Sequence, residues 1–400
     1  MQKITTSYYD LGCDPELFFE KNGKIIPSEK VIPEQLWFLQ EYNNPTNDVP
    51  LTQRKKYSGV VVQDGIQVEL NPRASHCREI LANDLRRLFT IIKKQLDKKE
   101  NKGVKLNFEQ VVKVSKATLN KSSSKCRTFG CMPSFNAYLP KEDNISRITV
   151  DPSVYLYRGG GGHIHIGLDN ESLKKLKQDY AKAVKVFDII VGNTCVIIDR
   201  HPLNVERRKN YGKAGEYRTP KYGLEYRTLS NFWLKDYRLF SLVTGLSRIA
   251  INFTTKSTEK NNYVDKLLSL VNEEDIINAI NNNDKELALK NFNKVKAFIV
   301  GHLFEDDSGN PLTKKRLLLF EHFMSKPLNY WFKEDSLTQW TTKENHQIGG
   351  FERFLEDKVL KDYQKTYKND YSMPQPVFVN NNYYGSTDSK FVGWDYGQRI

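Results

Sequence analysis

The 400-residue sequence predicts an α+β protein in which an antiparallel sheet is covered by helices on one face. Three observations support this class: strand-like stretches with alternating side chains, a turn signal that joins two of them, and helical apolar spacing between them. The hydrophobic fraction of 39% and the aromatic fraction of 12% are sufficient for a folded core. Global disorder is therefore not expected.

The first predicted strand runs from Tyr8 to Phe19. Gly12 and Pro15 interrupt it, and such residues in a strand mark a bulge or a close approach of the backbone. We therefore expect this strand to be irregular.

Residues 57–71, YSGVVVQDGIQVELN, predict a hairpin with its turn at Asp64-Gly65. In the second strand of this hairpin the side chains alternate between two faces. The apolar face carries Ile66, Val68 and Leu70, and the polar face carries Gln67, Glu69 and Asn71.

Helical apolar spacing follows from Ser75 to Lys98, and the stripe can cover the apolar face of the sheet. A second helix is predicted from Glu171 to Val191, with Asp169 and Asn170 as capping residues. Residues 233–253 predict a third helix. Between the first two helices lie a loop-rich stretch and a predicted strand at residues 159–167, GGGGHIHIG.

The sequence divides into three predicted parts. Residues 1–253 form the main domain, residues 254–345 form a Lys- and Asn-rich helical annex, and residues 346–400 form a Tyr- and Asn-rich extension. The oligomeric state cannot be read from these patterns.

The formal net charge of +13 suits nucleic acid, and it equally suits anionic substrates such as ATP or acidic peptides. Charge alone therefore does not decide the partner. The first thirty residues carry acidic side chains in place of a basic start, and no stretch reaches the roughly 18 apolar residues of a membrane span. These features predict a cytoplasmic protein without a membrane partner.

The five cysteines are an odd number and do not form paired Cys-x-x-Cys clusters. We expect free thiols in a reducing compartment. Cys126 and Cys131 are close enough in sequence to form a disulfide or to bind a metal, but no further Cys or His stands close by.

Four segments place polar residues at positions i and i+2, which directs both side chains to one face of a strand. The pairs are Asp14 with Glu16, Gln67 with Glu69, His163 with His165, and Glu225 with Arg227. A sheet face loaded with carboxylates and imidazoles is electrostatically unfavourable unless cations neutralise it. Divalent metal is the expected cation, because carboxylates with an imidazole bind Mg²⁺ or Mn²⁺.

Arginines in the basic loop and the strand after it are candidates for phosphate binding. Arg208, Arg218 and Arg227 provide planar guanidinium groups for phosphate oxygens, and Arg200 and Arg207 stand nearby.

Each motif also has an ordinary structural interpretation. Asp14-Pro15-Glu16 can be a turn, Glu69 a solvated strand residue, and Arg207-Arg208-Lys209 a solvated patch. The glycines at 159–162 can form a flexible loop, and they lack the trailing Gly-Lys-Ser/Thr of a Walker loop. Two imidazoles on one strand face suit ligands better than core packing, and the combination of motifs favours a functional site.

Four motifs in order carry a resemblance to a known family: GCDPEL, VELNP, GGGHIHIG, and RRKNYGKAGEYR leading into GLEYRTLSNFW. Over about residues 8–235 the chain resembles the phage-type COOH-NH2 ligases (type 2), relatives of glutamine synthetase and glutamate-cysteine ligase. The resemblance implies a glutamine synthetase-like antiparallel sheet whose concave face holds ATP, two or three divalent ions and both substrates.

The resemblance also implies roles for individual residues. The implied metal ligands are Asp14, Glu16, Glu69, His163 and Glu225. His165, Arg208, Arg218 and Arg227 are implied to contact the nucleotide, and Arg218, Arg227 and Glu225 to act in catalysis. The first motif has Asp-Pro-Glu in place of the Glu-x-Glu of glutamine synthetase, and not every metal ligand of that enzyme has an equivalent here. The number of ions therefore stays open.

The implied activity is ATP-dependent ligation of a carboxylate to an amine through an acyl phosphate, with Mg²⁺ or Mn²⁺, in the host cytoplasm if the chain is phage-encoded. The substrates, small molecules or peptides, and the base that deprotonates the amine are not readable. Three alternatives remain: a guanidino-type phosphotransferase on the same fold, a basic nucleic-acid-binding or virion protein with a decayed ligase fold, and a metallohydrolase using His163 and His165.

Overall fold

The computed structural model describes residues 9–41, 55–75, 78–127, 134–259, 262–303, 321–332 and 335–342. These residues combine helices with antiparallel sheets, which confirms the predicted α+β class. The predicted extension at 346–400 lies outside the described residues.

Two six-stranded sheets and one two-stranded sheet are described, and every strand pair in them is antiparallel. The first sheet has, in spatial order, β1 (Tyr9–Cys13), β12 (Ile164–Leu168), β14 (Gly223–Tyr226), β13 (Glu216–Arg218), β9 (Ser134–Asn136) and β10 (Ile145–Ser146). The second has β3 (Lys24–Ile26), β2 (Glu16–Lys21), β6 (Gln67–Pro72), β5 (Lys55–Asp64) and β4 (Gln35–Glu41), with β7 (Val104–Asn107) also paired to β2. The small sheet pairs β11 (Tyr157–Gly159) with β8 (Val111–Lys113).

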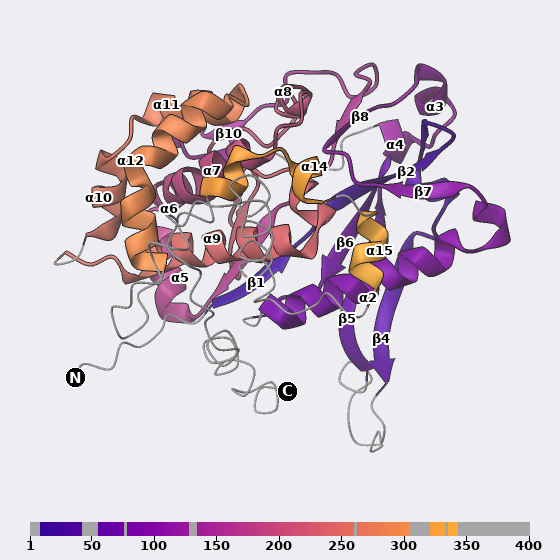
Figure 1. The fold of residues 1–400 in the computed structure, drawn as a ribbon, viewed down its shortest axis with the longest axis horizontal. Helices are drawn as coiled ribbons and strands as arrows, with labels where there is room; N and C mark the ends of the chain where they lie inside the picture. Colours follow the sequence, from indigo (N-terminus) through magenta and orange to yellow (C-terminus); the bar gives the residue numbers. More distant parts are fainter. Residues whose placement is uncertain are drawn as a thin grey trace, which may run out of the picture.

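The helices fall into three sets along the chain. The first is α2 (Arg78–Leu96), with the short α3 (Lys116–Asn120) and α4 (Ser124–Arg127) after it. The second is α5 (Asn170–Gln178), α6 (Tyr180–Phe187), α7 (Asn193–Ile198), α8 (Asn204–Arg207) and α9 (Tyr237–Lys256). The third, in the predicted annex, is α10 (Tyr263–Ser269), α11 (Glu273–Asn281), α12 (Lys285–Leu303), α14 (Leu328–Trp331) and α15 (Ser336–Thr341). Figure 1 shows the first sheet beside α5–α7 and α9, and the second sheet beside α2.

The predicted single strand from Tyr8 to Phe19 is wrong, because β1 and β2 are separate strands in different sheets. The chain leaves β1 at Asp14 and Pro15, and proline has no backbone N–H with which to continue a strand ladder. The Pro15 carbonyl instead accepts a hydrogen bond from Leu70 N (2.9 Å). As a result Asp14 and Glu16, two residues apart, lie where the two sheets meet.

The predicted helix from Glu171 to Val191 is interrupted at Asp179. This residue has φ −155° and ψ 82°, and its carboxylate caps α6 by accepting a hydrogen bond from Lys182 N at 2.9 Å. A π-helical turn, Asp188–Gly192, then leads into α7. Asp179 therefore starts a new helix, which is a common role of Asp at this position.

The two predicted faces of the second hairpin strand are confirmed from Gln67 onward. Ile66 is not part of that strand, because it lies in the turn and packs in a separate apolar cluster with Phe18 and Val112. Val68 and Leu70 are fully buried, and so are Leu85, Leu88 and Phe89 of the apolar stripe of α2. The polar side chains of β6 therefore lie on the face away from α2.

Helix α6 covers the apolar face of the first sheet, as α2 covers that of the second. Phe187 packs against Tyr226, with ring centroids 5.2 Å apart, and Tyr180 stacks on Tyr217 at 6.1 Å. Since neighbouring residues of a strand point to opposite faces, Glu225 and Arg218 lie on the face away from this helix.

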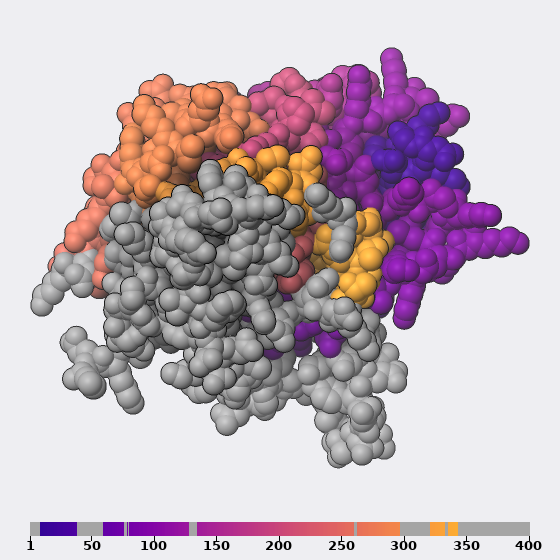
Figure 2. All heavy atoms as spheres, viewed as in Figure 1, coloured from indigo at the N-terminus to yellow at the C-terminus, as the bar shows by residue number. Residues whose placement is uncertain are grey.

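The short helix α15, far along the chain, closes over the α2 layer. Trp340 is fully buried, its ring centroid lies 5.1 Å from that of Phe89, and its Nε1 donates to the Leu234 carbonyl at 2.7 Å. Figure 2 shows α14 and α15 between the α10–α12 region and the α2 region on this side of the molecule. Helices from distant parts of the sequence thus share one face.

Within the described parts of the chain, no helix combines the length and the apolar character needed to cross a membrane.

Candidate active site

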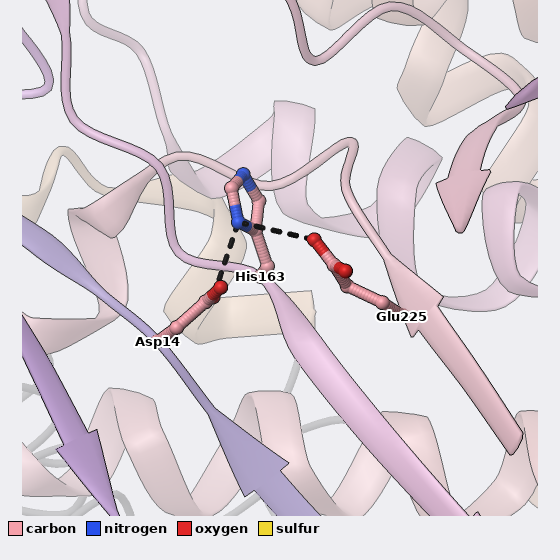
Figure 3. A group of neighbouring side chains, drawn as sticks. All are labelled: Asp14, His163 and Glu225. Atoms are coloured by element: carbon pink, nitrogen blue, oxygen red, sulfur yellow. Dashed lines mark ion pairs between the residues drawn. The ribbon is translucent and has the colours of Figure 1, made fainter. Parts of the chain in front are cut away.

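A first group of candidate ligands consists of Asp14, His163 and Glu225 (Figure 3). His163 Nδ1 lies 3.1 Å from Asp14 Oδ1 and 3.8 Å from Glu225 Oε1. His165, on the same strand face, has its Nε2 3.2 Å from Asp14 Oδ2. The strand register explains this arrangement, because His165 pairs with Gly12 on one side and with Glu225 on the other.

A second group consists of Glu16, Asp64 and Glu69 on the second sheet. Glu16 and Glu69 are directly opposite each other in the register of β2 and β6. Asp64 ends β5 and pairs with Gln67 across the hairpin, so it shares the polar face of β6. In each group the candidate ligand atoms lie within 4.8 Å of one another.

The sequence prediction did not include Asp64, because the Asp64-Gly65 pair was interpreted only as a turn. The signal was present in the hairpin register: a two-residue turn at Gly65 and Ile66 places Asp64 opposite Gln67, whose face carries Glu69. The five predicted metal ligands are divided between the two groups: Asp14, His163 and Glu225 make up the first, and Glu16 and Glu69 join Asp64 in the second.

The electrostatic environments of the two groups differ. Burial raises the pKa of Asp14, but the charges and hydrogen bonds of His163 and His165 outweigh burial and hold that pKa well below its usual range. Burial and the nearby carboxylates Asp14 and Glu16 raise the pKa of Glu69 to about 9. The same causes raise the pKa of Asp64 to about 7.

Two predicted arginines contact the first group. Arg227 Nη1 and Arg218 Nη1 lie 3.3 and 3.4 Å from Glu225 Oε1. Arg227 is fully buried and Arg218 is partly exposed. Guanidinium groups and candidate metal ligands therefore share one face of β13 and β14.

The third predicted arginine, Arg208, is directed elsewhere. It is buried, and its guanidinium donates to the backbone carbonyls of Gly212 and Thr228. Burial and the neighbouring Arg207 lower the pKa of Arg208 to about 9. In this arrangement Arg208 links the backbone of its own loop to the segment that follows β14.

The glycine run at 159–162 packs tightly beside the first group and does not form an open loop. Gly162 N donates to the Leu229 carbonyl at 3.0 Å, and Gly161 N donates to Glu16 Oε2 at 2.8 Å. A Cβ at Gly161 would lie 2.6 Å from His163 Nε2. The absence of a side chain there makes room for the imidazole.

A buried carboxylate holds the strand from the helix side. Asp188, in the π-helical turn, accepts hydrogen bonds from Tyr226 OH (2.6 Å), Thr228 Oγ1 (3.2 Å) and Gly215 N (2.6 Å). Burial raises its pKa to about 6. Tyr226 and Thr228 alternate along the chain with Glu225 and Arg227. Asp188 therefore fixes residues 225–228 through the side chains on the helix side of the sheet.

The donor atoms of both groups fit divalent cations. Carboxylate oxygens with one imidazole are suitable ligands for Mg²⁺ or Mn²⁺. His163 Nε2 is buried and has no hydrogen-bond partner among the described residues. The raised pKa values of Asp64 and Glu69 also indicate a surplus of negative charge that protons or a cation must neutralise.

Part of the chain matches a known protein family. Residues 142–300 match the family described as Phage phiEco32-like COOH.NH2 ligase-type 2. The match confirms the predicted resemblance to this family. A search of curated proteins gave no match.

The part of the chain that matches the COOH-NH2 ligase family contains His163, His165 and Glu225 with the three predicted arginines. Asp14, Glu16, Asp64 and Glu69 precede it. The family match extends through α10 and α11 into α12, so it includes helices of the predicted annex as well as strands of the main domain.

The cavity of about 500 Å³ between the β9 side of the first sheet and helices α6, α10 and α11 is separate from these groups. Its wall includes Tyr138, Lys185 and Ile276, and Lys185 is paired with Glu273. The candidate site is therefore defined by charged side chains at the junction of the sheets and not by this cavity.

Three of the five cysteines lie in the described part of the chain. Cys13, Cys126 and Cys195 are buried free thiols, as expected. Cys131, the partner in the alternative of a Cys126–Cys131 pair or metal site, lies outside the described residues.

Proposed function

We propose that this chain is an ATP-dependent carboxylate–amine ligase that forms an amide through an acyl phosphate on a glutamine synthetase-like sheet. The family match supports ligation. The observation that carries the proposal is the position of Glu225, which lies beside His163 of the first acid group and within 3.4 Å of both Arg218 and Arg227. Acidic ligands for cations and guanidinium groups for phosphate thus converge on one strand face.

The proposed chemistry has two steps. A carboxylate oxygen of the first substrate bonds to the γ-phosphorus of ATP while the bond to the bridging oxygen breaks, and ADP leaves. The amine nitrogen then bonds to the carbonyl carbon, phosphate leaves with the former carboxylate oxygen, and the nitrogen loses a proton.

Two divalent ions, Mg²⁺ or Mn²⁺, fit the proposal. Asp14, His163 and Glu225 would hold one, and Glu16, Asp64 and Glu69 would hold the other. When bound, such ions neutralise these carboxylates and the phosphate oxygens of the nucleotide.

Arg218 and Arg227 would bind the oxygens of the transferring phosphoryl group. Charge develops on these oxygens during transfer, and fixed guanidinium groups stabilise it most strongly where water is excluded. The full burial of Arg227 supports this role for it. His165, beside Asp14, would contact a nucleotide phosphate.

The experiment that tests the proposal is a substrate screen with the full-length protein, ATP and Mg²⁺. Pools of carboxylates are combined with pools of amines, phosphate release is measured, and mass spectrometry searches for products joined with loss of water. Hydroxylamine serves as a general amine, because it converts an acyl phosphate into a hydroxamate. We expect phosphate release that depends on a carboxylate, with ADP and an amide or hydroxamate as products.

Other outcomes would redirect the assignment. A phosphorylated guanidino compound without an amide would indicate the phosphotransferase alternative. Nucleic-acid binding without any ATP turnover would indicate the decayed-ligase alternative.

A further inference from the structure

A buried tyrosine lies between the two acid groups and contacts members of both. Tyr211 is in the loop between α8 and β13, and only 6% of its surface is exposed. Tyr211 lies within the motif RRKNYGKAGEYR, but no role was predicted for it from the sequence, because Glu16 and His163, which it contacts, are distant in the chain.

The hydroxyl of Tyr211 holds one oxygen of Glu16. Tyr211 OH donates to Glu16 Oε2 at 2.5 Å, and the same oxygen accepts from Gly161 N at 2.8 Å and lies 3.5 Å from Gln67 Nε2. Three donors on Oε2 leave Oε1 as the oxygen for a cation shared with Asp64 and Glu69. Partners that orient a ligand in this way tune metal affinity.

The ring of Tyr211 contacts the first group and the arginines. Its centroid lies 5.6 Å from that of His163 in an edge-on arrangement. The guanidinium carbons of Arg207 and Arg227 lie 5.5 and 5.7 Å from the same ring centroid. A cation near an aromatic ring is stabilised by the ring's quadrupole, so the ring favours the position of Arg227 beside Glu225.

We propose that Tyr211 is a positioning residue that joins the two acid groups: its hydroxyl orients Glu16 of the second group, and its ring sets His163 and Arg227 of the first. This inference rests on the proposed function for the identity of the ligands. It assigns separate tasks to two parts of one side chain, which two substitutions can separate.

The test compares Tyr211→Phe, which removes only the hydroxyl, with Tyr211→Leu, which also removes the ring. Tyr155→Phe is the matched control, because the Tyr155 hydroxyl also donates to a carboxylate, Glu206 (2.5 Å), and neither residue belongs to the two acid groups. Each full-length variant is titrated with Mn²⁺ in the absence of ATP, and free Mn²⁺ is counted by electron paramagnetic resonance. Melting temperatures and the kcat and KM of the reaction are measured alongside.

We expect wild type to bind two Mn²⁺ ions. Tyr211→Phe should weaken one of the two by about 10-fold or more, in the range found when partners of metal ligands are removed, and leave the other within about 2-fold. Tyr211→Leu should weaken the binding of both ions. It should also lower kcat by about 10-fold relative to Tyr211→Phe, since the ring also positions Arg227. Tyr155→Phe should leave both Mn²⁺ affinities unchanged.

The outcomes separate this inference from the proposed function. If wild type binds fewer than two ions, the proposed pair of cation sites fails, and the role of Tyr211 in joining them fails with it. If wild type binds two ions and forms an amide, but Tyr211→Phe keeps both affinities, the positioning role is wrong and the ligase proposal stands. Equal weakening by Tyr211→Phe and Tyr155→Phe would show an effect that is not specific to Tyr211 and would also overturn its role.

Discussion

The two acid groups differ in how the protein neutralises them. In the first group, Asp14 lies between two imidazoles, and Glu225 lies beside two guanidinium groups. In the second group, the hydrogen bonds described for Glu16 and Glu69 come from neutral donors, such as the Tyr211 hydroxyl and the Asn71 amide. The pKa of Asp14 is accordingly lowered, while that of Glu69 is raised.

This difference indicates that neutralising the carboxylates of the second group depends more on an added cation than neutralising those of the first. A carboxylate whose pKa is raised keeps its proton until a cation replaces it. The first group is partly neutralised by the chain itself, and its basic side chains are also placed to bind phosphate. We therefore expect substitutions in the first group to affect turnover most, and those in the second to affect cation binding most.

The largest effect is expected for Glu225→Gln and His163→Ala. Each removes a ligand of the first group from the face opposite the helices, so turnover should be abolished while the fold is retained. Activity with the substrates found by the screen and melting curves are the measurements. Near-normal activity in either variant would show that its role is wrongly assigned.

A loss of about 10²-fold or more in kcat is expected for Arg218→Ala and Arg227→Ala, with a smaller change in ATP binding, because the guanidinium groups act on charge that develops during transfer. Arg147→Ala is the control, since Arg147 is exposed and paired with Asp143.

The same variants test the nucleic-acid alternative. Unchanged ATP turnover, together with a salt dependence of nucleic-acid binding reduced by about one charge, would favour that alternative over the ligase.

Asp64→Asn should lower the affinity for one divalent ion by about 10–100-fold and leave the affinity for the other unchanged, because only the second group contains this carboxylate. Calorimetry with Mg²⁺ or the Mn²⁺ titration measures both. Asp97→Asn is the matched control, because Asp97 is exposed and directly follows α2. If Asp64→Asn bound both ions like wild type, Asp64 would be an ordinary hairpin residue.

A smaller effect is expected on stability as a function of pH. The folded-state pKa values of Asp64 and Glu69, about 7 and about 9, are raised above ordinary carboxyl values near 4. The folded protein then binds more protons than the unfolded chain, so stability of the ion-free protein falls as pH rises from about 4 toward 9. Melting in a chelator should therefore occur at a lower temperature at pH 9 than at pH 6, and Mg²⁺ should reduce this difference.

Asp64→Asn provides the internal check on that result, since it removes one of the two carboxyls and should flatten the pH dependence. A pH difference in melting that is the same with chelator and with Mg²⁺ would contradict the account of the second group.

Local patterns predicted much of the site. The i, i+2 spacing correctly placed His163 with His165 and Glu225 with Arg227 on shared faces, because side chains alternate along any strand. The apolar stripe of α2 and the apolar face of β6 were predicted for the same reason.

The rest depends on contacts between distant segments. The chain passes from one sheet to the other at Asp14 and Pro15, because β1 and β2 pair with different strands. The local sequence does not specify those partners. Asp64 resembled a turn residue, and Tyr211 meets Glu16 across 195 positions of the chain. Arg208 stood in a basic run typical of phosphate binding, yet backbone carbonyls accept its hydrogen bonds.

The central claim, ligation through an acyl phosphate, is tested most directly by following one oxygen atom. The carboxylate substrate is labelled with ¹⁸O, turnover proceeds with ATP and the amine, and released phosphate is analysed by mass spectrometry. Because the carboxylate oxygen that bonds to the γ-phosphorus leaves with phosphate, we predict one ¹⁸O in each phosphate released with an amide. Unlabelled phosphate accompanying amide formation would contradict the acyl phosphate.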